Sequence, residues 1–138
     1  MTDDEKIKLP PRLPQIMAET TRLKFAMASD PLTGCLLRTL AATKPGGNFL
    51  ELGTGTGVAT AWLLDGMDRR SSLISVEKDE TVLAVARKFL GHDRRVDFFQ
   101  VDAGWWLGHA QCFFFDLIFA DSWPGKYDHL DEALDMLN

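Results

Sequence analysis

The sequence predicts an α/β fold, in which helices cover both faces of a doubly wound parallel β-sheet. From residue 48 onward, apolar segments of strand length alternate with segments of helical periodicity, as is typical of a parallel sheet with right-handed crossovers. The segment at 113–120 is apolar on both faces except at Asp116, as expected for a central parallel strand. A glycine-spaced loop at 53–57 joins the first strand of the sheet to a helix. We therefore expect a ligand beyond the carboxyl ends of the strands, where such sheets bind their ligands.

The 138 residues are predicted to form one domain with three parts. A tail with three prolines is expected at 1–14, N-terminal helices within 15–43, and an incomplete α/β core at 48–138. The two N-terminal helices are predicted at 15–28 and 32–42, on either side of a break at Ser29-Asp30-Pro31.

The elements of the core follow from apolar periodicity in the same way. Strands are predicted at 49–52, 72–76, 96–101 and 113–120. Helices are predicted from about 57, at 79–90 with Asp79 as the N-cap, at about 103–110 and at about 126–137.

The loop after the first strand reads acid-x-G-x-G-x-G, starting at Glu51. A helix that begins directly after such a loop presents unpaired backbone N–H groups to a ligand. The dinucleotide fingerprint G-x-G-x-x-G would need glycine at position 58, where this chain has Val58. A nicotinamide-dependent oxidoreductase is therefore disfavoured. A carboxylate at Glu51 suits a ligand that carries cationic groups better than it suits a pyrophosphate.

Each later strand also ends in an acidic residue. Glu77 follows Gly57 by twenty residues, the spacing at which an acid reaches the ribose hydroxyls in nucleoside-binding α/β folds. Asp102 ends the third strand and Asp121 the fourth. Asp102 is also in position to cap the following helix, and the two roles are compatible.

Taken together, the loop and the strand ends resemble the class I S-adenosylmethionine-dependent methyltransferases, in which the glycine loop is motif I. The stretch FDLIFAD, which ends at Asp121, resembles the small-molecule O-methyltransferases related to catechol and caffeoyl-CoA O-methyltransferases. The resemblance implies a Rossmann-like sheet, with strands in the order 3-2-1-4 in this chain. It also implies that S-adenosylmethionine is bound by Glu51, Gly53, Thr54, Gly55, Gly57, Glu77, Lys78, Asp102, Ala103 and Asp121.

The same resemblance identifies Asp121 and Lys126 as candidate catalytic residues. In the resembled enzymes this aspartate binds a divalent metal, and a lysine three residues later helps to deprotonate the acceptor hydroxyl. Here position 124 is Pro124, and the nearest lysine is Lys126, whereas Tyr127 matches their tyrosine position. The further metal ligands of those enzymes follow a fifth strand, and this chain ends at Asn138 before it. We therefore expect no metal site, with Mg²⁺ at Asp121 as the alternative.

Composition limits the partners. A formal net charge of −5 disfavours nucleic acid, whose binding relies on Lys and Arg, so a small-molecule acceptor is expected. No apolar run approaches 18 residues, so no membrane span is expected. Cys35 and Cys112 are predicted to be buried, reduced thiols, which indicates a cytoplasmic protein.

The fourth strand would be an apolar edge of the sheet, which invites pairing with another chain and makes a homodimer one expectation. The alternative function is a truncated or non-catalytic S-adenosylmethionine-binding module that needs a partner or the missing C-terminal strands.

Overall fold

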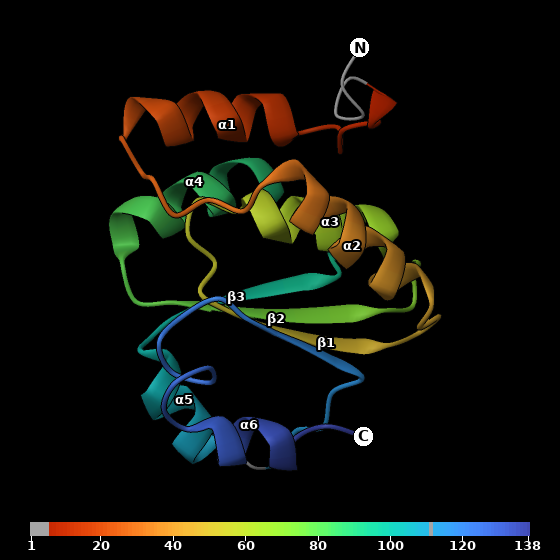
Figure 1. Cartoon of the computed structure of the whole chain (residues 1–138), viewed down its shortest axis with the longest axis vertical. Coiled ribbons are helices and arrows are strands. Elements are labelled where there is room, and N and C mark those ends of the chain that lie inside the picture. Colours follow the sequence, from red (N-terminus) through yellow and green to blue (C-terminus); the bar gives the residue numbers. More distant parts are fainter. Residues whose placement is uncertain (1–5, 111) are drawn as a thin grey trace.

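A four-stranded parallel sheet in the order β3-β2-β1-β4 lies at the centre of the molecule (Figure 1). The computed structural model describes residues 6–110 and 112–138. The predicted fold class and strand order are confirmed. The strands are β1 (Asn48–Leu52), β2 (Ser72–Glu77), β3 (Val96–Gln100) and β4 (Leu117–Ala120).

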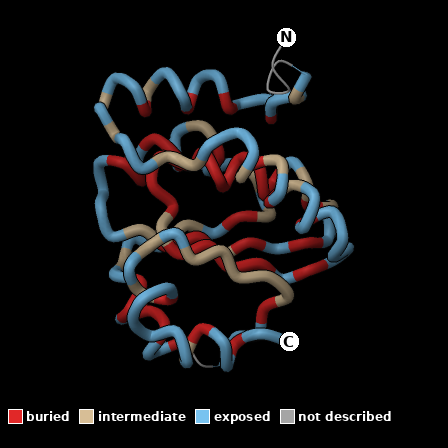
Figure 2. The backbone as a smooth tube through the Cα atoms, in the orientation of Figure 1, coloured by how far each residue is buried: buried red, intermediate tan, exposed pale blue. Residues whose placement is uncertain are grey.

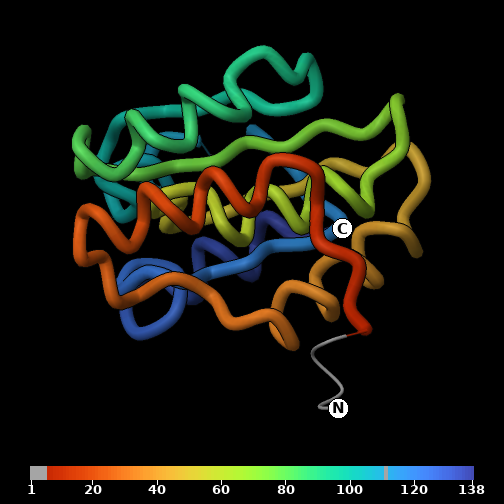
Figure 3. The backbone as a smooth tube through the Cα atoms, turned by 90° about the horizontal axis from the view of Figure 1, so that it is seen from above, coloured from red at the N-terminus to blue at the C-terminus, as the bar shows by residue number. Residues whose placement is uncertain are grey.

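The helices form layers on the two faces of the sheet. One face carries the first four helices and the other carries the last two (Figure 1). The N-terminal helix lies outermost and packs against the third and fourth helices (Figure 3). The helices are α1 (Leu13–Arg22), α2 (Pro31–Ala42), α3 (Val58–Gly66), α4 (Glu80–Leu90), α5 (Ala103–His109) and α6 (Leu130–Asp135).

Two apolar clusters hold the layers together, one on each side of the sheet. The cluster under α1 to α4 is built around Trp62 and Phe49, and that under α5 and α6 around Leu52 and Leu107. Figure 2 shows the buried residues concentrated in the central strands and in α3, which lies between α1 and the sheet (Figure 1). The helix α3 directly follows the glycine loop and is buried on nearly its whole surface, so packing fixes the position of its first turn.

Three predicted boundaries are wrong. The helix predicted at 15–28 ends at Arg22, because Lys24 adopts a left-handed conformation with φ 55°. The strand predicted at 113–120 is paired with β1 only from Leu117, because the backbone N–H and C=O of Phe115 bond to the segment before the C-terminus instead. The helix predicted at 126–137 starts at Leu130, because the residues before it form a turn in which Gly125 N–H donates to the Asp128 carbonyl.

The cap of α2 permits a stability prediction. Asp30 is its N-cap and accepts bonds from the backbone N–H and the hydroxyl of Thr33, at 2.9 and 2.8 Å. Replacing Asp30 with alanine should cost about 1 kcal/mol of unfolding free energy, since the first turn loses its acceptor. Urea unfolding measures this cost. The matched control is Asp97→Ala, because Asp97 is an exposed carboxylate on β3 that caps no helix; an equal loss in both variants would contradict the prediction.

No helix within the described residues is both long and apolar enough to cross a membrane. Both cysteines are free thiols. Cys35 is half-buried but Cys112 is exposed, so the expectation that both would be buried is wrong for Cys112.

Candidate functional site

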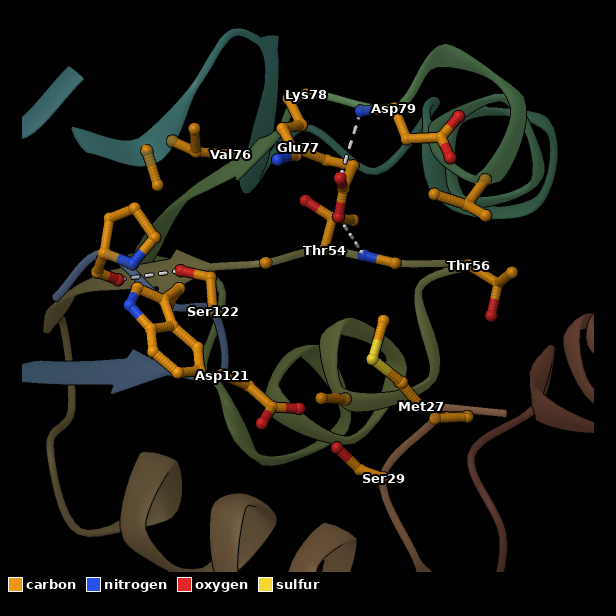
Figure 4. Close-up of a pocket in the computed structure, with 18 of the residues that line it drawn as sticks. Met27, Ser29, Thr54, Thr56, Val76, Glu77, Lys78, Asp79, Asp121 and Ser122 are labelled. Atoms are coloured by element: carbon orange, nitrogen blue, oxygen red, sulfur yellow. Dashed lines mark hydrogen bonds between the residues drawn. The ribbon is translucent and has the colours of Figure 1, made fainter. Parts of the chain in front are cut away.

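A cavity of about 560 Å³ lies at the carboxyl ends of the strands, between the loop after β1 and the loop after β4 (Figure 4). This volume is within the range of small-molecule sites. The structure therefore brings most of the predicted site residues to one space. Those that line the cavity are Gly53, Thr54, Gly55, Glu77, Lys78, Asp102, Ala103, Asp121 and Lys126.

The first glycine of the loop brings two strand ends into contact. Gly53 has φ 98°, and its N–H donates to the Val76 carbonyl at 2.8 Å. A Cβ at this position would lie 2.7 Å from the carbonyl oxygen of Asp121. Only glycine therefore allows the loop after β1 to lie against the end of β4.

The third glycine serves packing rather than the cavity. Gly57, with φ 98°, does not line the cavity, and a Cβ there would lie 2.9 Å from the Cβ of Ala86 on α4. It allows α3 to approach α4 closely.

Glu77 is held in place by the loop it faces. Its Oε2 accepts the N–H of Gly55 at 2.8 Å, and its Oε1 accepts the N–H of Asp79 at 3.0 Å (Figure 4). The carboxylate is half-buried and lines the cavity. Because a carboxylate oxygen can accept two hydrogen bonds, each keeps an acceptor position that suits one hydroxyl of a vicinal diol.

Asp102 caps α5, as expected. Its Oδ1 accepts the backbone N–H of Trp105 at 3.0 Å, and the residue also lines the cavity. Its Oδ2 accepts no hydrogen bond from the described residues. Capping and ligand contact are therefore compatible.

The loop after β4 supplies the charged and aromatic side of the cavity. Desolvation raises the pKa of Asp121, and the nearby Lys126 partly offsets this effect. The Lys126 ammonium lies 5.2 Å from the ring centroid of Tyr127, and the rings of Trp123 and Tyr127 have centroids 4.6 Å apart. An acid, an amine and two aromatic rings thus share one wall.

The sequence reasoning missed part of that wall. Phe25, Met27 and Ser29, from the segment between α1 and α2, also line the cavity. The sequence predicts a helix over Phe25 and Met27 and a break at Ser29, and neither feature indicates a role in the cavity. Trp123 also lines the cavity, and its position two residues after Asp121 was a signal that could have identified it.

Glu51 does not reach the cavity. Its side chain is 0% exposed, and its Oε1 accepts the hydroxyls of Thr60 and Ser75 at 2.5 and 2.6 Å. We expected Glu51 to face the cationic end of a ligand directly. Strand pairing instead turns its side chain under α3, away from the cavity. Burial raises the pKa of Glu51 to about 7, although the two hydroxyl bonds act in the opposite direction.

The raised pKa of Glu51 makes stability depend on pH. Between its ordinary value of 4.5 and about 7, the native protein keeps a proton that the unfolded chain has released. The free energy of unfolding contributed by this group should therefore fall as pH rises through that window, by about 1–3 kcal/mol. Glu51→Gln should flatten this part of the profile in urea unfolding measured at several pH values. A profile unchanged by the substitution would contradict the prediction.

The described residues contain no group of three or more His, Cys, Asp or Glu side chains arranged to hold a metal ion. Within the described part of the chain, Asp121 is therefore not part of a cluster of such side chains.

Comparison with known proteins identifies a family. The model of a family described as "Methyltransferase domain" matches residues 50–137. No match was found among curated proteins.

Several solved structures share the fold. An O-methyltransferase from Bacillus cereus in complex with SAH has a TM-score of 0.85 and 24% identity, over 98% of this chain and 65% of that one. TomG, an O-methyltransferase from Streptomyces achromogenes involved in tomaymycin synthesis and solved with SAM, has a TM-score of 0.83 and 20% identity, over 100% and 71%. The SAH-bound methyltransferase PaMTH1 from Podospora anserina has a TM-score of 0.77 and 23% identity, over 96% and 60%. The chain thus spans about two thirds of the length of these proteins.

Proposed function

Because the chain belongs to the methyltransferase domain family, we propose that it binds S-adenosylmethionine and transfers its methyl group to a hydroxyl of a small molecule. The observation that carries the proposal is the cavity in which the glycine loop and the Glu77 carboxylate face the same space. The neighbours solved with SAM or SAH support the choice of cofactor.

The residues present fit this cofactor. Glu77 offers the two acceptor positions that a ribose diol needs, and Asp102 offers a free oxygen at the next strand end for an amino group of the base. The backbone of Gly53 and Gly55 can approach the amino-acid end closely because neither carries a side chain. We propose that Thr54, Lys78 and Ala103 complete the wall against which the cofactor lies.

The cofactor supplies an activated methyl group, and this chain supplies orientation. Methyl transfer does not require a covalent intermediate with the protein, since most of the rate enhancement comes from holding the acceptor about 3–3.5 Å from the methyl carbon. We propose that the loop after β4 does this, with Asp121 and Lys126 beside the acceptor hydroxyl. Lys126 is the candidate base, a role in which its neutral amine would accept the proton that the hydroxyl loses.

Lys126→Met is expected to lower kcat about tenfold to hundredfold with little change in cofactor affinity, because it removes the amine and keeps the aliphatic stem. Single-turnover assays of methyl transfer measure this. The control is Lys88→Met, which removes an amine from α4 outside the cavity. An unchanged rate in Lys126→Met would rule out its role as base.

Two measurements test the function itself. Calorimetric titration should detect binding of S-adenosylmethionine and of S-adenosylhomocysteine. A screen of small hydroxylated compounds for methyl uptake, with and without Mg²⁺, should then identify an acceptor. Binding without any transfer would favour the alternative of a non-catalytic cofactor-binding module. No binding by the folded protein would refute both.

We further propose a small-molecule acceptor rather than nucleic acid, which the net charge of −5 supports, and a cytoplasmic location, which two free thiols support.

A homodimer is proposed because β4 is an edge strand of half-buried apolar residues in the described sheet, and such edges favour pairing. Light scattering after gel filtration checks this, and a monomer at all concentrations would contradict it.

A further inference from the structure

Glu51 is a buried acid that has hydroxyl partners and, in the described part of the chain, no cationic partner. It is 0% exposed, and no salt bridge within the described residues includes it. Its Oε2 is buried without any hydrogen-bond partner in the described residues. Because isolating an ionised carboxylate from water is costly, this environment favours the protonated form.

A short chain of hydrogen bonds joins Glu51 to the cavity. Ser75 on β2 donates to Glu51 Oε1 at 2.6 Å, and the Ser75 hydroxyl is 2.5 Å from the hydroxyl of Thr54. Thr54 is part of the cavity wall (Figure 4). On the other side, Thr60 of α3 donates to the same Oε1. Glu51 therefore lies directly behind the wall, and a change in the charge of the cavity will act on it.

The two charged groups that contribute most to the raised pKa of Glu51 are both negative. They are Glu77 at the end of β2 and Asp121 at the end of β4, and each raises the pKa of Glu51 beyond the effect of burial. Both line the cavity. A cation that entered between them would act on Glu51 with the opposite sign and favour its ionised form.

We propose that Glu51 is a proton-exchanging residue, protonated in the free protein and ionised when a net positive ligand occupies the cavity. The O–H bond of the carboxyl breaks, its electron pair stays on the carboxylate, and the proton passes to bulk water. The inference rests on the proposed function, because S-adenosylmethionine is the net positive ligand: its ammonium and sulfonium outnumber its one carboxylate. S-adenosylhomocysteine lacks the sulfonium and is neutral overall.

The protein therefore distinguishes cofactor from product by charge, in a pH-dependent way. Because burial raises the pKa of Glu51 toward neutral pH, binding of S-adenosylmethionine at pH 7 should release a fraction of a proton, and binding of S-adenosylhomocysteine less. The sign follows from linkage: a ligand that releases a proton binds more tightly as pH rises. The affinity for S-adenosylmethionine relative to S-adenosylhomocysteine should increase up to about tenfold between pH 6 and pH 8.

Titration calorimetry in two buffers with different ionisation heats counts the protons exchanged. The wild-type chain should release more protons with S-adenosylmethionine than with S-adenosylhomocysteine. Glu51→Gln should abolish this difference, and Glu80→Gln, which alters an exposed acid at the start of α4, should retain it.

Equal proton release with the two ligands in the wild-type chain would overturn the inference and leave the proposed function intact, and this arm needs no variant to fold. Retention of the difference in a folded Glu51→Gln would overturn it as well. Failure of either ligand to bind would instead refute the proposed function, and the inference with it.

Discussion

Glu77→Ala is expected to weaken the binding of S-adenosylmethionine about a thousandfold. The substitution removes the acceptor of the Gly55 and Asp79 backbone N–H groups, and it removes both acceptor positions for the ribose hydroxyls. Hydrogen bonds to a charged group contribute about 1.5–3 kcal/mol each, so the loss of two from the ligand amounts to about 3–6 kcal/mol. Titration calorimetry measures the affinity directly.

Two further variants isolate the cause. Glu77→Gln keeps one carbonyl acceptor and should fall between the wild-type chain and Glu77→Ala. Glu80→Ala removes an exposed acid three residues later, at the start of α4, and this variant should bind S-adenosylmethionine like the wild type. Near-normal affinity in a folded Glu77→Ala would show that the ligand is held elsewhere.

Gly53→Ala is expected to lower the free energy of unfolding by about 4 kcal/mol. The backbone at Gly53 has φ 98°, which an L-residue adopts only with strain, and the new Cβ would lie 2.7 Å from the Asp121 carbonyl oxygen. Strain of about 1–3 kcal/mol and overpacking of about 1–3 kcal/mol add at this position. In a protein of ordinary stability this loss is a large part of the total free energy of unfolding. Urea unfolding measures the loss.

Gly46→Ala is the matched control for strain alone. Gly46 also has a positive φ, 67°, but a Cβ there meets no atom within 4 Å. It should therefore cost only about 1–2 kcal/mol. Equal losses of unfolding free energy in the two variants would mean that the contact of residue 53 with Asp121 does not affect stability. The loop after β1 would then not pack tightly against the loop after β4.

The strand ends of the candidate site could be predicted from the sequence because a parallel sheet has a simple geometry. Its strands all end at the same edge, so Glu77, Asp102 and Asp121 had to lie near one another once the strands were identified. The glycine loop was predictable for a similar reason, since it directly follows β1. In these cases position along the chain is equivalent to position in space.

Other features could not be predicted because they depend on which face a side chain occupies. Glu51 belongs to the same motif as Gly53, yet pairing of β1 with β2 and β4 turns it under α3 against Ser75 and Thr60. Gly57 also belongs to the motif, but its contact is with α4. The segment that carries Met27 lines the cavity only because α1 ends at Arg22, before the left-handed Lys24.

Residue order was thus sufficient for the α/β class, the strand order and the acids at the strand tips, because periodic burial and short crossovers leave few alternatives. Packing alone assigned the roles within the glycine motif. Gly53 lies against Asp121 and Gly57 against α4, and Glu51 is enclosed with no counter-ion among the described residues. The physical reason is that a helix laid across a sheet covers whatever faces it, and no local pattern records which neighbour will be there.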